Sequence, residues 1–485
     1  MIFNSIQFLW FFPVVAIAFF FLPKRWRWVL LLAASYYFYV SWDPQYIVIL
    51  LAVTTTGYLC GLWLERETQA GKRRIILVLG LVACLGILST FKYLDLSNRL
   101  LHLISGQLGI TALQHVFLIF PLGISFYTFQ TMGYIMDVYR GVAPAEKHVG
   151  IYALFIAFFP HLSAGPIARA NQLLPQFRET QAPDYEGIVS GLQRIAWGFF
   201  KKLVIADRLA ALVNTVYGDP TSYTGWALIL ATYAFAFQIY CDFSGYADIA
   251  LGAARVLGFR LHENFQQPYY AQSIPDFWRR WHITLYSWLR DYVYYPLSRA
   301  LRRAGFGSAS LLAIILPTML TMLISGLWHG TQWTFILWGG LHGLYVIGSV
   351  LWNRSAIQLR LPFPPPFIRF LNIFVTFNLV SFAWIFFRAS SLRDAVYIVQ
   401  HLFAPAETGA SVIDLMPGGG YEWLIALAAI LMMELVQWQQ RKSGSIREVV
   451  RRQPAWLRWS AYYGLVVLIL MFGKFEAVEF IYANF

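Results

Sequence analysis

Long apolar runs separated by short polar connections extend from one end of the chain to the other. The first covers residues 6–22, and most of the later ones approach the ~20 residues that an α-helix needs to cross the hydrocarbon of a bilayer. Several runs are short or contain Gly and Pro, which favours re-entrant or interfacial segments there. The later runs fall at residues 28–43, 45–64, 75–94, 113–137, 149–166, 187–206, 224–241, 311–328, 333–352, 369–388, 421–439 and 460–473. The pattern predicts an all-α polytopic membrane protein with roughly 11–13 transmembrane or re-entrant helices.

The composition supports a membrane protein. Hydrophobic residues make up 58% of the chain and charged residues only 13%, about half the charged fraction of a soluble domain. The first apolar run is followed, not preceded, by its basic residues, so we interpret it as a retained helix and not as a secretory signal. Because no internal repeat, basic tail or low-complexity linker is visible, residues 1–485 are predicted to form a single membrane-embedded domain.

Connections rich in Lys and Arg alternate with connections that nearly lack them. Under the positive-inside rule the basic connections face the cytoplasm, which places both the N-terminus and the C-terminus outside it. The net charge of +13 then reflects this bias, and we expect no nucleic-acid partner. The basic connections are residues 23–28, 65–74, 354–369 and 441–458.

Residues 259–310 interrupt the pattern, because arginines are mixed there with many Trp and Tyr. The segment is too polar to span and too apolar to be a free loop, so we predict helices lying in, or dipping into, the cytoplasmic side of the bilayer. Helical spacing places Trp278, His282 and Tyr286 on one face. From the residues alone, the arginines fit either anionic lipid or a phosphate-bearing ligand, whose oxygens match the guanidinium fork.

Two histidines lie in positions that require an explanation. His282 follows two arginines, whose charge discourages protonation and favours a neutral ring. His329 ends the apolar run 311–328, where an ionisable ring is costly without a partner or a function. Gly326 and Gly330 flank it four residues apart, which fits close helix packing or room for a substrate. His342, inside another apolar run, is interpreted as a packed or capped histidine.

Five stretches of the chain, and their order along it, resemble the membrane-bound O-acyltransferase family. The resemblance covers residue 1 to about residue 350 and is strongest to bacterial members of the alginate and polysaccharide O-acetyltransferase membrane-subunit type. It is based on "FPLGISFYTFQTMGYIMDVYRG", "FPHLSAGPI", "YCDFSGYADIALGAARVLGF", "FWRRWHITLYSWLRDYVYYPL" and "SGLWHG".

The resemblance implies roles for single residues. His329 matches the invariant histidine of the family, His282 its second essential position, and His161 a further histidine that is a possible secondary site residue. The aspartates at 242 and 248 lie six residues apart, a poor spacing for a carboxylate pair on one helix face, so we interpret them as structural acceptors or lining residues. The core-lining residues implied in this way are Asp242, Ser244, Asp248 and Trp328.

The resemblance also implies a reaction: transfer of acetyl from cytosolic acetyl-CoA to a hydroxyl, for acetylation of an extracytoplasmic polysaccharide of the alginate or cellulose type. A hydroxyl becomes a good nucleophile when a base takes its proton, and histidine suits that task at neutral pH. We expect His329 to act as the base and His282 to orient it or to stabilise the oxyanion. The phosphates of the donor would bind near Arg279, Arg280 and Arg290.

The expected surroundings follow from the same resemblance. We expect a multi-pass protein of the bacterial inner membrane with both termini periplasmic, surrounded by membrane lipid. The acceptor is either the polysaccharide or a periplasmic partner, such as an SGNH-type O-acetyltransferase. No metal is expected, because the histidines are scattered without ligand spacing. Two alternatives stay open from the sequence: a polytopic transporter or channel, and a non-catalytic scaffold that recruits a secreted acetyltransferase.

Overall fold

The computed structural model describes residues 1–92, 121–179, 181–307, 310–354, 363–405, 412–475 and 480–481. Every regular element in these residues is helical, which confirms the all-α prediction. The predicted outward connection 95–112 lies outside the described residues.

Eight helices in the described part of the chain are long and apolar enough to cross a membrane. The first helix is shorter, and several predicted runs form interrupted or shorter helices instead. The predicted run 149–166, for example, is divided into two helices at Phe158, just before Pro160. The eight candidate spans contain α3 (Ile47–Arg66), α4 (Ala70–Lys92), α12 (Trp226–Val256), α16 (Leu311–His329), α17 (Trp333–Arg354), α18 (Pro365–Arg388), α20 (Gly419–Ser443) and α22 (Ala455–Phe472).

The described chain separates into two compact units, and the predicted single domain stays a prediction. Unit 1 contains residues 1–191 and 250–262. In it, α3, α4 and α6 pack against one another, and the side chains of α6 are almost all buried. Besides α3 and α4 its helices are α1 (Ile6–Phe21), α2 (Lys24–Val40), η1 (Pro44–Tyr46), α6 (Ile124–Arg140), α7 (Val149–Ala157), α8 (Phe159–Leu162) and α9 (Ala170–Arg178).

Unit 2 contains residues 192–249 and 263–481, and all the strongest site candidates lie in it. The helices α10 (Tyr185–Phe199) and α12 contribute residues to both units. The other elements of unit 2, besides α16, α17, α18, α20 and α22, are η2 (Phe200–Ala206), α11 (Asp207–Gly218), η3 (Pro220–Ser222), η4 (Pro268–Tyr270), α13 (Ile274–Trp278), α14 (Ile283–Leu289), η5 (Arg290–Tyr294), α15 (Tyr295–Arg303), α19 (Leu392–His401), η6 (Val412–Leu415) and α21 (Ile446–Arg451).

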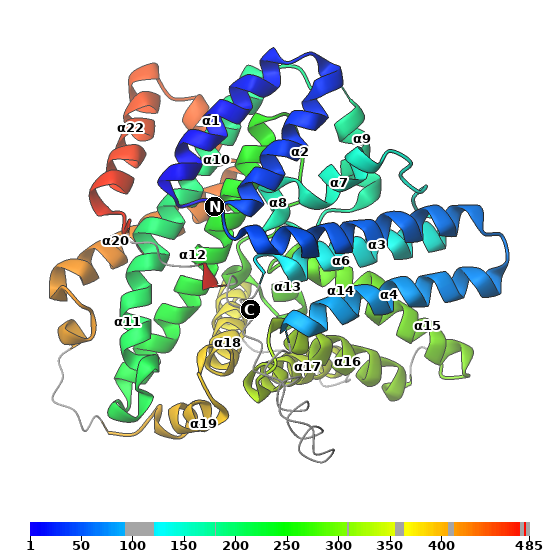
Figure 1. The fold of residues 1–485 in the computed structure, drawn as a ribbon. Coiled ribbons are helices and arrows are strands. Elements are labelled where there is room, and N and C mark those ends of the chain that lie inside the picture. Colours follow the sequence, from blue (N-terminus) through cyan, green and yellow to red (C-terminus); the bar gives the residue numbers. More distant parts are fainter. Residues whose placement is uncertain are drawn as a thin grey trace, which may run out of the picture. The chain divides into compact units, whose positions relative to one another are not determined.

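The α16–α17 hairpin carries His329 at its turn, and its helices run side by side (Figure 1). A Cβ atom at Gly326 would lie 2.3 Å from the Phe335 carbonyl oxygen, and one at Gly339 would lie 2.4 Å from that of Met322. The backbones approach so closely that only glycine fits at either position. Close packing is therefore the correct interpretation of Gly326.

The arginine-rich segment is helical but not continuous. After α13 the chain turns at residues 279–282, and α14, η5 and α15 then follow one another directly, with η5 and α15 packed against α16. The predicted common helix face of Trp278, His282 and Tyr286 is wrong, because the helix is broken between the first two. The rings of Trp278 and Tyr286 nevertheless stack, with centroids 6.5 Å apart.

Candidate functional site

The break between α13 and α14 places His282 in a left-handed conformation, with φ of 43°, and buries it completely. A non-glycine residue in this region costs about 1–3 kcal/mol unless the surrounding structure holds it. Asn264 provides that support, because its backbone oxygen accepts from Ile283 N at 3.0 Å. Its side-chain oxygen accepts from Thr284, from the backbone N at 3.2 Å and from the hydroxyl at 2.7 Å. Such held strain is typical of functional positions.

Asn264 also determines how the His282 ring presents its nitrogens. The Asn264 side-chain oxygen lies 3.4 Å from His282 Nδ1, and its two bonds from Thr284 fix it as an acceptor. Burial lowers the pKa of His282 to about 3, so the ring is neutral at physiological pH. A neutral imidazole has one donor and one acceptor nitrogen. Donation from Nδ1 to Asn264 therefore leaves Nε2 as an acceptor.

Trp328 brings the two predicted catalytic histidines to one place. Its ring centroid lies 5.9 Å from that of His282 and 4.8 Å from that of His329, and both contacts are edge-on. Both histidines are buried, with 0% and 2% of their surface exposed. Residues 47 positions apart in the sequence thus contact the same indole in the interior of unit 2.

Aromatic rings from two further helices complete the wall around His329. Trp338 of α17 and Phe387 of α18 approach it edge-on, with centroids at 5.0 and 5.2 Å. Trp338 is fully buried and stacks on Trp384 of α18, with centroids 5.8 Å apart. Such surroundings exclude water and strengthen electrostatic interactions with a bound ligand. Sequence reasoning identified His329 but not these three aromatic residues, because no local pattern links α16 to α17 and α18.

A third histidine, His342, contacts the same wall. Its ring lies 5.1 Å from Trp338 and 5.0 Å from Trp278, between centroids, and it is completely buried. Neither ring nitrogen has a hydrogen-bond partner in the described chain. The ring thus lies among aromatic side chains, as expected, but no hydrogen bond caps it in the described residues.

The three arginines proposed for donor phosphates differ in their surroundings. Arg280 forms an ion pair with Asp276 at 2.9 Å, and Arg290 forms one with Asp291 at 2.9 Å. Arg279 is exposed and forms no ion pair with a described residue. Partly exposed ion pairs contribute little stability, so a phosphate can compete for them. Arg279 is the most available of the three.

The predicted core-lining residues of α12 bind two buried lysines. Lys201 contacts Asp248 at 2.6 Å and donates to Ser244 at 2.8 Å. Lys202 contacts Asp242 at 2.6 Å and also pairs with Asp207 of α11 at 2.8 Å. The two aspartates thus act as acceptors in ion pairs. Sequence reasoning did not single out the lysines, although two of them inside the predicted apolar run 187–206 were a usable signal.

His161 lies in unit 1, so only its contacts within that unit are given. Only 2% of its surface is exposed, and its ring lies 5.7 Å from that of Phe158. Burial lowers its pKa to about 4, and its Nε2 has no hydrogen-bond partner among the described residues. The ring is therefore neutral, and its role stays a prediction.

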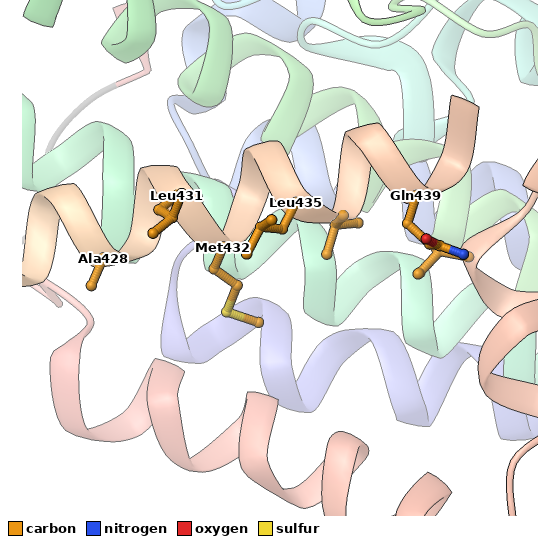
Figure 2. Close-up of a pocket in the computed structure, with 7 residues that line it drawn as sticks. Ala428, Leu431, Met432, Leu435 and Gln439 are labelled. Atoms are coloured by element: carbon orange, nitrogen blue, oxygen red, sulfur yellow. The ribbon is translucent and has the colours of Figure 1, made fainter. Parts of the chain in front are cut away.

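An apolar groove of about 380 Å³ lies along α20, away from these histidines in the chain (Figure 2). Among its lining residues only Gln439 is polar, so the groove offers no acid or base. The residues that line it are Ala428, Leu431, Met432, Leu435, Val436, Gln439 and Ile446.

Comparison with known proteins gives a consistent result. Residues 148–392, which include His282, His329 and His342, match the membrane-bound O-acyltransferase family, MBOAT. A protein of Azotobacter vinelandii named "Probable alginate O-acetylase AlgI" is 39% identical over 83% of this chain and 78% of its own length. A protein of the same name in Pseudomonas aeruginosa is 38% identical over 83% of this chain and 75% of its own length. A peptidoglycan O-acetyltransferase of Helicobacter pylori is 34% identical over 78% of this chain and 73% of its own length.

The family match favours an enzyme over the transporter and the scaffold that the sequence left open. The similarity to the alginate O-acetylases extends over most of the chain, well beyond the segment that carries the histidines. The chain therefore belongs to the membrane-bound O-acyltransferase family and is an O-acyltransferase of the alginate O-acetylase type.

Proposed function

We propose that the protein transfers acetyl from cytosolic acetyl-CoA to a hydroxyl, for acetylation of an extracytoplasmic polysaccharide. The single observation that supports this best is the packing of His282 and His329 against Trp328 in a buried aromatic site. The named relatives act on alginate and peptidoglycan, and a glycan acceptor for this chain is inferred from them. The acceptor is the polymer itself or a hydroxyl of a periplasmic SGNH-type partner.

The reaction needs one base and one leaving group. His329 takes the proton of the acceptor hydroxyl while that oxygen attacks the thioester carbonyl. The carbon–sulfur bond then breaks, and the proton passes from His329 to the coenzyme A thiolate. General base catalysis of this kind contributes roughly 10²–10⁴-fold.

His282 has a different task in this scheme. Because its Nδ1 faces Asn264, its Nε2 carries a lone pair and cannot donate to an oxyanion. Of the two roles expected from the sequence, orientation is therefore the one favoured. We propose that Nε2 accepts a hydrogen bond from protonated His329 and holds that ring in line with the reacting oxygen.

The donor would bind with its phosphates near Arg279, with Arg280 and Arg290 as further contacts, and with its thioester directed inward. The proposal keeps the predicted location: the bacterial inner membrane, with both termini periplasmic and lipid around the spans. Only acetyl then crosses, and the coenzyme stays on the cytoplasmic side.

The test is acetyl transfer from labelled acetyl-CoA by the purified full chain in vesicles, with an oligosaccharide acceptor. His329→Ala should lower the transfer rate by roughly 10²-fold or more while protein yield and gel-filtration profile stay normal. His262→Ala, which changes an exposed histidine, is the matched control and should keep full activity. Activity of His329→Ala equal to that of the control would contradict the assignment.

A further inference from the structure

We propose that His342 belongs to the acyl-donor site and hydrogen-bonds an amide group of the thioester arm that links the donor's phosphates to its acetyl group. The inference rests on the proposed function and deepens it. It assigns a ligand-binding task to a residue outside the His282–His329 pair.

The first support is the state of the His342 ring. It is completely buried, and neither Nδ1 nor Nε2 has a hydrogen-bond partner among the described residues. Buried polar groups are nearly always paired, and leaving one unpaired costs free energy that a phenylalanine in the same place would not. A ring kept in this state is explained if a ligand supplies the missing partners.

The second support is the chemical match. A neutral imidazole presents one N–H donor and one lone-pair acceptor on opposite sides of its ring. A secondary amide presents a carbonyl acceptor and an N–H donor, which are the complementary groups. The arm of coenzyme A carries two such amides between its phosphates and its sulfur. A thioester ligand without an amide could not satisfy the ring in this way.

The third support is position. Ring contacts connect Tyr286 to Trp278 at 6.5 Å and Trp278 to His342 at 5.0 Å. They continue from His342 to Trp338 at 5.1 Å and from Trp338 to His329 at 5.0 Å. Arg279 follows Trp278 in the chain, so the series leads from an exposed cation to the proposed base, with His342 in its middle.

Two neighbours along this series are also incompletely bonded. The indole N–H groups of Trp278 and Trp338 have no hydrogen-bond partner in the described residues, although both side chains are buried. Buried indoles usually find an acceptor. Three adjacent side chains with unused polar atoms point to a ligand with several acceptors and not to a single packing defect.

The test compares two donors in the full chain. S-acetyl-N-acetylcysteamine carries an amide near its sulfur, whereas S-ethyl thioacetate carries none. In the wild type the amide-bearing donor should have the higher kcat/KM. In His342→Phe that preference should fall by roughly 3- to 10-fold, the factor of one ordinary hydrogen bond, while use of S-ethyl thioacetate stays unchanged. His342→Gln, which restores a donor and an acceptor, should recover part of the preference.

The controls separate the two proposals. Tyr345→Phe, a neighbour on α17 whose ring lies 5.9 Å from His342, should leave both donors unaffected. An equal loss on both donors in His342→Phe would show a packing role and overturn this inference, while the proposed function would stand. A wild type that uses no acetyl thioester, with or without an amide, would overturn the proposed function and this inference together.

Discussion

Unit 2 contains two buried polar clusters that are built in opposite ways. In one, Lys201 and Lys202 bind Asp242, Asp248 and Asp207 at 2.6–2.8 Å, so that each charge faces an opposite charge. In the other, His282, His329 and His342 are enclosed by aromatic rings. The first arrangement satisfies charges within the fold. The second keeps titratable rings in a dry setting, where a ligand can use them.

This difference predicts where a substitution acts. Loss of a partner in the charged cluster leaves a buried uncompensated charge, so its effect should be on stability. Loss of His282 or His329 removes a ring that we propose acts in the reaction, so its effect should be on transfer.

The largest effect on stability is expected for Lys202→Met. Removal of one partner of a buried ion pair costs about 3–5 kcal/mol, and here Asp207 and Asp242 would both lose their cation. The free energy of unfolding in mixed micelles measures it. The double variant Lys202→Met, Asp242→Asn should be more stable than the single variant, because one of the two charges is removed.

An exposed pair provides the control for this prediction. Arg451 pairs with Glu448 at 3.0 Å on α21, and both are solvent-exposed. Arg451→Met should change the stability by less than about 1 kcal/mol. If Lys202→Met lowered the free energy of unfolding as little as Arg451→Met does, the charged cluster would not stabilise the fold. The proposed difference between the two clusters would then be wrong.

The next prediction concerns how the free energy of unfolding depends on pH through His282. Burial lowers the pKa of His282 to about 3 in the folded protein, below its ordinary value near ~6.5. The unfolded chain therefore binds a proton at this ring first, and stability that is fully present above pH ~6.5 decreases as the pH falls toward 3. Each pH unit in that window should cost up to about 1.4 kcal/mol from this group.

The measurement is the free energy of unfolding at several pH values for wild type and His282→Gln. The variant lacks the titrating ring, so its stability should decrease less steeply between pH 6 and pH 4. His262→Gln, at an exposed position, should keep the wild-type slope. Identical slopes for His282→Gln and wild type would mean that His282 is protonated normally in the fold and is not the neutral ring described above.

The contrast between the clusters also shows what the sequence could predict. The helical class and most spans follow from apolar runs, because lipid requires every backbone group to be bonded within the segment. His329 and His282 were found from local motifs. Their common contact Trp328 was also named, but His342 was interpreted as ordinary packing. What makes it unusual is that neither ring nitrogen has a hydrogen-bond partner in the described part of the chain, and no local pattern contains that information.

The charged cluster and the helix break were missed for related reasons. Lys202 pairs with Asp242 across two helices, and a spacing argument along one helix cannot detect such a pair. The break before His282 depends on Asn264, 18 residues earlier, whose oxygen accepts from the following turn. In both cases contacts between residues far apart in the sequence determine the structure, and the local pattern does not.

The smallest effect, and the finest test of the comparison, concerns the arginines at the outer end of the aromatic series. Arg279 is exposed and has no ion pair among the described residues, whereas Arg280 is paired with Asp276 at 2.9 Å. If the donor's phosphates bind here, Arg279→Ala should raise the KM for acetyl-CoA by roughly 2- to 5-fold, the factor of one exposed charge pair, with kcat unchanged. The KM for S-acetyl-N-acetylcysteamine, which has no phosphate, should stay constant. Arg280→Ala should act less, because its guanidinium is already shared with a carboxylate. An equal effect of Arg279→Ala on both donors would indicate a lipid-binding or structural arginine, and the phosphate assignment would then be wrong.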